Sequence, residues 1–205
     1  MRHFLIWILM VLTGTHVMSQ DTVYYENGSI HSVGKWQEGV QDGQWYFYYP
    51  DGSRSAIQYF EKGDLAGEQM YFYPSGQLQV KEYWKNGAPA DSSWSYFENG
   101  LLEKKGRYDN GLYEGKWIFY YENGHIRRTG SYTMGLPEGT WVFYYENGVL
   151  WQQGALRQGA EHGFWHYFDE DGKPAYDGSY ERGKQSGIWY KYDRSGKRKK
   201  WKSFE

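Results

Sequence analysis

Cysteine is absent from the 205 residues, so the sequence offers no site for a disulfide, a thiol nucleophile or a lipid attached through an N-terminal cysteine. Proline is scarce, with five residues, and aliphatic side chains are few beyond residue 20. The longest apolar run, Phe4–Leu12, is too short for a membrane-spanning helix, which needs about 20 residues. Neither sign of charge dominates, with 23 Lys and Arg against 25 Asp and Glu, which argues against a nucleic-acid partner.

The first residues differ in composition from everything that follows them. Arg2 precedes the apolar run, and Val17 and Ser19 suit the –3 and –1 positions of a signal-peptidase site. The pattern predicts a signal peptide over 1–19 and an exported mature chain over 20–205, located in the periplasm, at the outer surface or outside the cell. An uncleaved membrane anchor is the alternative.

Aromatic residues and glycine are abundant, with 22 tyrosines, 11 tryptophans and 27 glycines, and they recur every 24 residues without insertion or deletion. A fixed period of this length is typical of a repeat architecture and predicts one array of about seven and a half units. The turn glycine occupies positions Gly28, Gly52, Gly76, Gly100, Gly124, Gly148, Gly172 and Gly196. A second glycine ladder comprises Gly39, Gly63, Gly87, Gly111, Gly135, Gly159 and Gly183.

One unit, 115–138, is the right length for two strands and two turns, with no room for a helix. Residues 116–121 are rich in aromatic and β-branched side chains, which favour a strand, and Asn123-Gly124 predicts a type I′ hairpin turn. Residues 125–133 would return as the second strand, and 135–139 would form a longer turn into the next unit. The predicted fold is all-β: an elongated single-layer antiparallel sheet of tandem hairpins, twisted into an open trough.

A two-residue turn at Asn123-Gly124 would place Phe119 opposite Arg128 and Tyr121 opposite Ile126. Tyr121 and Ile126 would then share the face that carries Trp117. Glycine in the middle of the returning strand, as at Gly130, predicts a β-bulge or a sharp bend.

The sequence shows no constellation typical of catalysis, so we expect neither an enzyme nor a cofactor or metal site. His162 and His166 lie four residues apart, about 13 Å along a strand, which is too far to share an ion. The acidic run 169–171 occupies a turn position of the repeat and lacks the further spaced ligands of a calcium loop.

The second half of each unit resembles the MORN signature, G-x-W/Y-x-x-G-x-x-x-G, as in 130–139 and 154–163. The strand W-x-F-Y-Y-x-N-G, as in 141–148, is similar to the bacterial MORN-variant repeat, whose proteins are widely described as antitoxin-like. The resemblance implies a β-hairpin array and a protein- or membrane-contacting role. Residues 43–52 also resemble secreted choline- and glucan-binding repeats, although those units are nearer 20 residues long.

A dense basic run follows the last turn, and it has two interpretations. It could form a weak contact with an anionic membrane surface, or its lysines could protect the last edge strand from aggregation. The run consists of Lys197, Arg198, Lys199, Lys200 and Lys202.

The middle of the array departs from the repeat between residues 58 and 95. Rings are lost there, which predicts a shallow partner-binding notch; plain repeat drift is the alternative. The candidate notch residues are Gln69, Trp84, Ser93, Trp94 and Ser95.

These observations predict an exported, non-catalytic scaffold whose partner is another protein, with an antitoxin- or immunity-like role. The alternative function is a cell-wall or glycan-binding aromatic repeat protein.

Overall fold

The computed structural model describes residues 21–205, and the predicted signal peptide over 1–19 lies outside them. The described part is all-β, as the sequence predicts, and none of its residues form a helix that could cross a membrane. Its strands are β1 (Asp21–Tyr24), β2 (Ile30–Gln37), β3 (Val40–Tyr48), β4 (Arg54–Glu61), β5 (Asp64–Leu65), β6 (Gly67–Phe72), β7 (Leu78–Lys85), β8 (Ala88–Tyr96), β9 (Leu102–Asp109), β10 (Leu112–Tyr120), β11 (Ile126–Thr133), β12 (Leu136–Tyr144), β13 (Leu150–Arg157), β14 (Ala160–Phe168), β15 (Pro174–Glu181), β16 (Lys184–Tyr192) and β17 (Arg198–Phe204).

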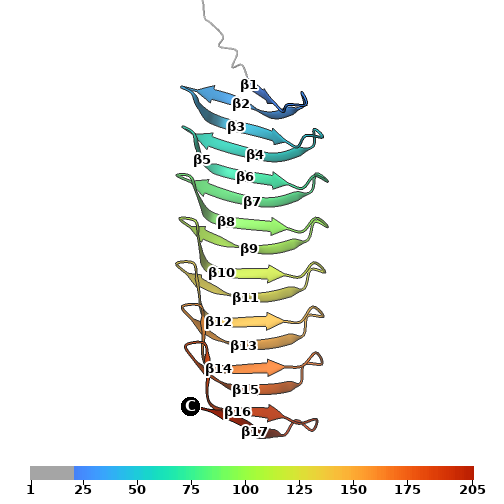
Figure 1. Ribbon diagram of the computed structural model, residues 1–205, viewed down its shortest axis with the longest axis vertical. Coiled ribbons are helices and arrows are strands. Elements are labelled where there is room, and N and C mark those ends of the chain that lie inside the picture. The colour runs from blue at the N-terminus through green and yellow to red at the C-terminus, as the bar shows by residue number, and fades with distance from the viewer. Residues whose placement is uncertain (1–20) are drawn as a thin grey trace, which may run out of the picture.

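The strands form one open antiparallel sheet in which each strand pairs with its neighbours in the chain (Figure 1). The first strand of the third hairpin is interrupted, so β5 and β6 together pair with β4. Eight hairpins follow one another, from β1–β2 to β16–β17, and we number them in that order. Their tips, the turns within each hairpin, line one edge of the sheet, and the turns that connect successive hairpins line the other.

The hairpin tip is not the predicted type I′ turn. Gly124 N donates to Tyr121 O (2.9 Å), and Gly124 alone has a positive φ, +87°, whereas Asn123 does not. This is a type I turn followed by a left-handed glycine, the arrangement of longer hairpin loops. The Asn123 side chain explains the preference, because its Oδ1 accepts the backbone N–H of His125 (2.9 Å) and stabilises the turn from within.

The type I′ turn occurs instead at the connecting edge. Met134 and Gly135 have φ values of +50° and +80°, and Thr133 pairs directly with Leu136. The predicted longer turn over 135–139 is therefore wrong: the turn has two residues, and β12 begins at once. Gly139 then forms a bulge within β12, with φ +73°.

The strand register confirms one predicted pair and corrects another. Phe119 lies opposite Arg128, as predicted, but Ile126 lies opposite Tyr120 and not Tyr121, because the ladder shifts between Phe119 and Tyr120. Ile126 therefore does not share the Trp117 face through a pairing with Tyr121.

The mid-strand glycines lie at a register shift, as predicted, and they also have a packing role. An ideal Cβ on Gly130 would lie 2.2 Å from Cδ2 of Trp141, so the indole ring occupies the space that a side chain would need. The same relation joins Trp45 to Gly34, Trp117 to Gly106, Trp165 to Gly154 and Trp189 to Gly178.

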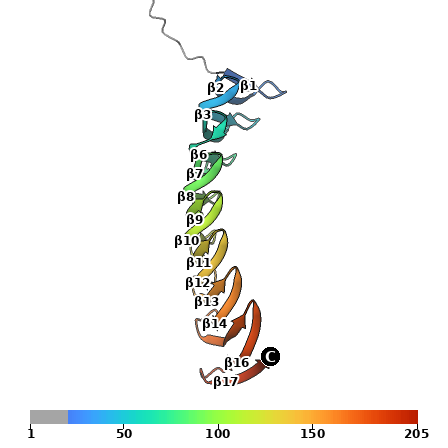
Figure 2. The ribbon, with the colours of Figure 1, turned by 90° about the vertical axis from the view of Figure 1, so that its left-hand side faces the viewer.

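These five tryptophans form the core, with exposed fractions of 0–2 %. Each hairpin is bent into an arc (Figure 2), and we call the tryptophan-bearing side the inner face and the opposite side the outer face. Burying one indole removes about 200 Å² from water, worth about 5 kcal/mol. The indole N–H is satisfied as well: Trp117 Nε1 donates to Arg107 O (3.0 Å), ten residues earlier, and the other four tryptophans repeat this bond.

Both edges of the sheet carry hydrogen bonds that tie successive hairpins together. At the tips, a tyrosine hydroxyl reaches the next hairpin, as when Tyr121 Oη donates to Tyr144 O (2.8 Å). At the connecting edge, the turn glycine donates backwards, as Gly135 N does to Tyr113 O (3.0 Å). A single-layer sheet without a covering layer is thereby braced along both sides.

The contact between glycine and tryptophan gives the first prediction. Gly130→Ala should lower the free energy of unfolding by about 2–3 kcal/mol, because the new methyl group collides with the Trp141 ring. In a Trp141→Ala background the same substitution should cost much less. Urea unfolding followed by circular dichroism measures both, with the exposed Ser131→Ala as the matched control; equal costs in the two backgrounds would refute the contact.

Candidate functional site

Two pairs in the middle of the array depart from the rule that a tryptophan covers a glycine. At the tryptophan positions of the third and fourth hairpins the chain has Gln69 and Ser93, and at the facing glycine positions of the preceding hairpins it has Gln58 and Glu82. Both partners change together in both pairs. This is what the packing requires, because a facing side chain leaves no room for an indole.

The Gln69 side chain makes the hydrogen bond that the indole N–H makes in other hairpins. Its Nε2 donates to Tyr59 O (3.1 Å), ten residues earlier, which is the bond that the tryptophans make, and also to Ala66 O (2.7 Å). Its Oε1 accepts the backbone N–H of Tyr59 (3.2 Å). The side chain is fully buried, so its amide is satisfied without contact with solvent.

The predicted notch residues are not gathered on one surface. Ser93 and Ser95 are nearly as inaccessible as Gln69, with exposed fractions of 2 % and 4 %, and none of these three lines either of the two hollows described below. Trp84 and Trp94 do line hollows, but different ones. Although rings are missing from the inner face here, the replacing side chains are buried and no notch opens to solvent at these three positions.

Two hollows lie beside each other across the second, third and fourth hairpins and share Tyr83 and Asp91. The Trp94 hollow has a volume of about 320 Å³ and lies between Tyr83 and Trp94. The Tyr59 hollow has a volume of about 530 Å³ and lies between Tyr59 and Tyr83, towards the connecting edge. Tyr59 and Tyr83 are 46 % and 49 % exposed, so rings are available to a ligand.

Polar side chains surround the Trp94 hollow. Lys81 Nζ and Glu68 Oε2 form an ion pair at 2.7 Å, and Ser92 Oγ donates to Asp91 Oδ1 (3.1 Å). Asp91 has a φ of +64° at the bulge position that is glycine in the other hairpins. The backbone of a non-glycine residue is strained in the left-handed region, and residues with such strain are frequent at functional sites.

Tyr59, Tyr83 and Asp91 are absent from the predicted site, although the sequence contains a signal for them. At the positions 24 residues apart that are equivalent to Tyr59 and Tyr83, the other hairpins have no ring; these residues are Lys35, Arg107, Ser131, Ala155, Ser179 and Ser203. Asp91 occupies a position at which the other hairpins of the array have glycine. The signal on the outer face is the gain of rings at these two positions, whereas the predicted notch is defined by the loss of rings from the inner face.

Several tyrosines of the described residues have raised pKa values. Burial raises the pKa of Tyr71, Tyr108 and Tyr167, which keeps these hydroxyls neutral. No group of three or more His, Cys, Asp or Glu within 21–205 is placed to hold a metal ion. His162 and His166 both lie on β14, on either side of the bulge glycine Gly163.

The basic run over 197–202 is partly engaged within the protein. Arg198 grips the buried Asp177 through Nε and Nη2 (2.8–3.1 Å) and lies over the Tyr190 ring at 3.4 Å. Lys199 pairs with Asp193 at 2.8 Å, and its hydrogen bond is the main cause that lowers the pKa of Asp193. Lys197, Lys200 and Lys202 form none of the described ion pairs, so they are what remains for an anionic surface.

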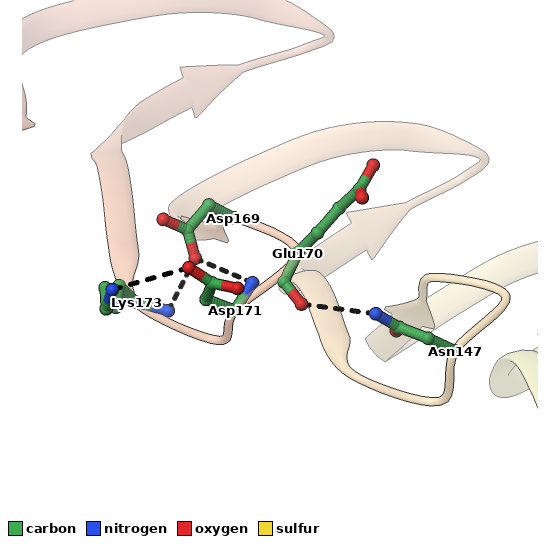
Figure 3. A network of polar contacts seen from close by, with 5 residues as sticks. All are labelled: Asn147, Asp169, Glu170, Asp171 and Lys173. Carbon is green, nitrogen blue, oxygen red and sulfur yellow. Dashed lines mark hydrogen bonds and ion pairs between the residues drawn. The ribbon is translucent and has the colours of Figure 1, made fainter.

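The acidic run at the seventh tip is a turn, as predicted. Asp169 Oδ1 accepts the backbone N–H groups of Asp171 (3.1 Å) and Lys173 (2.8 Å), and Lys173 Nζ lies 3.4 Å from Asp171 Oδ2 (Figure 3). Asn147 Nδ2 donates to Glu170 O (3.2 Å) and ties this tip to the sixth.

The junction between the last two tips is different from the others. Asp169 replaces the tyrosine that would reach the eighth tip, and Asp171 replaces the asparagine, so both kinds of side-chain tie are missing there. A hollow of about 630 Å³ lies at this junction, lined by Asp169, Lys191 and Asp193 among others. The hollow is explained by the missing ties.

Comparison with known proteins supports the repeat assignment. The model of the MORN repeat variant matches residues 41–62, 65–86, 113–133 and 137–154, which fall in the second, third, fifth and sixth hairpins. The predicted MORN-variant repeat is confirmed for these stretches. No curated protein matches the sequence.

Solved structures give only distant similarities. The crystal structures of TcdB2-TccC3 and of TcdB2-TccC3-Cdc42 align with 83 % and 84 % of this chain at 11 % identity, with TM-scores of 0.23 and 0.21. The chain spans only 12 % and 13 % of the lengths of those chains.

The exchange of tryptophan and glycine gives the second prediction. Gln69→Trp alone should lower the free energy of unfolding by about 2 kcal/mol, because the Gln58 side chain fills the space for the indole. Gln58→Gly alone should also destabilise, by about 1 kcal/mol, since it removes the bond from Gln58 Nε2 to Tyr71 Oη (3.0 Å) and adds a flexible glycine. The double variant should have a higher free energy of unfolding in urea than either single variant. If the losses of the two single variants simply add, the two positions are not coupled.

Proposed function

We propose that this array of MORN-variant hairpins is an exported, non-catalytic scaffold that binds another protein. The observation that carries the proposal is an exposed apolar ridge at the connecting edge, formed by Leu112, Met134 and Leu136. Their exposed fractions are 50 %, 76 % and 50 %. The five inner tryptophans that cover glycines are buried, whereas these three side chains present apolar surface to water.

The ridge occupies the turns that frame the fifth hairpin. Leu112 begins β10 and Leu136 begins β12, and the Leu112 side chain lies about 3.4 Å from where a Cβ on Gly135 would be. Met134 is the first residue of the type I′ turn between them. Equivalent side chains of neighbouring hairpins are about 10 Å apart, so the three make a continuous apolar strip.

Met134 occupies a position where the sequence favours polar residues. The equivalent left-handed turn positions hold Glu38, Lys62, Asn86, Asn110, Gln158 and Arg182. A methionine there keeps the left-handed strain and gains no turn hydrogen bond from its side chain. Flexible methionine side chains adapt to the surfaces of partner proteins, which supports a binding role.

A non-catalytic role is consistent with the chemistry of the described residues. Burial is the main cause that raises the pKa of Tyr71, Tyr108 and Tyr167, and the lowered pKa values of Asp51 and Asp193 arise from turn hydrogen bonds to Ser53 and from Lys199. The resemblance to antitoxin-like MORN-variant proteins, together with the predicted signal peptide, favours an immunity-like role outside the inner membrane.

The ridge gives the third prediction. Leu112→Asp combined with Leu136→Asp should abolish stoichiometric recovery of a protein partner from envelope extract, while the wild-type chain recovers it. The fold should persist, because Asp64 occupies the same turn position in the third hairpin. Val40→Asp changes the equivalent, 39 % exposed residue of β3 and serves as the matched control, which should retain the partner.

Two outcomes would contradict the scaffold proposal. Recovery of the same partner by the double variant would remove the ridge from the binding surface. Turnover of a substrate by the purified wild-type chain, lost on unfolding, would show that the protein is an enzyme.

Export gives the fourth prediction. Mass spectrometry of the mature chain, recovered from the envelope or the medium, should find Gln20 as the first residue. Ser19→Leu should block this cleavage and leave the longer chain in the membrane fraction. Wild-type protein that keeps residues 1–19 would support the uncleaved anchor instead.

A further inference from the structure

In the second, third and fourth hairpins, rings are missing from the inner face and present on the outer face. Gln69 and Ser93 replace inner tryptophans, while Tyr59 and Tyr83 occupy an outer position that has no ring in the other hairpins. Trp94 is the largest ring at its own outer position, where the other hairpins from the second onward have Tyr46, Met70, Ile118, Val142, His166 and Tyr190. Plain repeat drift would lose rings without adding them elsewhere. The combination indicates a surface that has been specialised across these hairpins.

The three rings lie in a row along the sheet. Tyr59 and Tyr83 occupy equivalent positions of adjacent hairpins, about 10 Å apart. Lys81 pairs with Trp94, so Tyr83 is the diagonal cross-strand neighbour of Trp94, about 7–8 Å away. Tyr83 therefore separates the Tyr59 hollow from the Trp94 hollow, and each hollow has an aromatic wall on both sides.

The ring of Tyr59 is held in place by the backbone beneath it. An ideal Cβ on Gly67 would lie 3.6 Å from Tyr59 Cδ1, so the ring rests against that bulge glycine. In the next hairpin Asp91 occupies the position equivalent to Gly67 and lines both hollows together with Tyr83. The bulge of the third hairpin thus supports the Tyr59 ring from one side.

Hydrogen-bonding groups complement these rings at short range. The Trp94 hollow offers Asp91, Ser92 and the Glu68–Lys81 pair, and the Tyr59 hollow offers Glu61, Lys85 and Asn86. Carboxylates outnumber ammonium groups in both linings, which disfavours a polyanionic ligand. Leucine, isoleucine and valine are absent from both linings, which disfavours an apolar peptide side chain as the occupant.

We propose that the two hollows form a binding groove for an extended, uncharged oligosaccharide. The negative faces of Tyr59, Tyr83 and Trp94 attract the polarised C–H groups of sugar rings, and Asp91 accepts hydrogen bonds from sugar hydroxyls. Two hollows in a straight row suit a linear chain of sugars better than a single ring. The groove is separate from the ridge of Leu112, Met134 and Leu136, so it adds a second binding surface to the scaffold.

Asp91 gives the proposal a test that separates a binding role from a structural role. Its left-handed backbone costs stability that glycine would not cost, so Asp91→Gly should raise the melting temperature. If the carboxylate binds sugar hydroxyls, the same substitution should weaken oligosaccharide binding about tenfold. A merely structural Asp91 would give higher stability with unchanged binding.

Titration calorimetry and tryptophan fluorescence with cellohexaose and chitohexaose, using the whole mature chain, test the groove. Wild-type protein should bind at least one of these uncharged hexasaccharides, and Tyr83→Ala should weaken that binding at least tenfold because Tyr83 borders both hollows. Phe164→Ala, a 44 % exposed ring of the seventh hairpin, is the matched control and should bind like the wild type.

Three results would overturn the proposal. They are failure of the wild type to bind either hexasaccharide, equal binding by the Tyr83→Ala and wild-type chains, and tighter binding of a heparin hexasaccharide than of the uncharged probes. The Leu112→Asp, Leu136→Asp double variant should keep its oligosaccharide affinity. That comparison distinguishes failure of the protein-binding ridge from failure of the groove.

Discussion

The contact between an indole ring and a glycine of the preceding strand is the constraint on which the rest of the structure depends. A single-layer sheet has no second layer to cover its apolar side, so the side chains of that face must cover one another. Trp117 achieves this by lying flat on Gly106, donating its N–H to Arg107 O and packing against Tyr113 at 4.0 Å between ring centroids. Because glycine is needed beneath each ring, the tryptophan and its glycine keep a constant spacing wherever both occur, and they are replaced together where one is lost.

The two edges of the sheet are braced by different kinds of hydrogen bond, and this difference determines at which junctions the bonds between successive hairpins are missing. Backbone bonds between connecting turns need only glycine, and they continue to the last hairpin, where Gly183 N donates to Glu161 O (2.9 Å). Tip bonds depend on side chains and can be lost by substitution. Phe97 loses its hydroxyl, but Asn99 still reaches Glu122 O (2.9 Å), whereas at the last junction Asp169 leaves no such bond. The eighth hairpin is instead tied to the seventh by the bond from Arg198 on β17 to Asp177 on β15.

Much of the fold follows from the sequence, because the period and the strand chemistry point to the same answer. The turn types could not be read in this way. Asn-Gly favours a type I′ turn in isolation, but here Asn123 caps a type I turn, and the residue with an unexpected positive φ is Met134, which has no such preference. The fate of Gln69 was also hidden, since a polar residue in place of tryptophan suggests exposure. Only its hydrogen bonds to the backbone show that an amide can replace an indole N–H.

The two faces of the sheet are subject to different physical demands, and this explains where binding surfaces can arise. On the inner face a change at one position requires a change at its partner, as Gln58 with Gln69 shows. The outer face and the connecting edge carry no such pairing, so Tyr59, Tyr83 or Met134 can be introduced without disturbing the core. A strained residue such as Asp91 is tolerated because each hairpin is braced by its neighbours on both sides. The array therefore separates the residues that hold it together from those that are free to contact a partner.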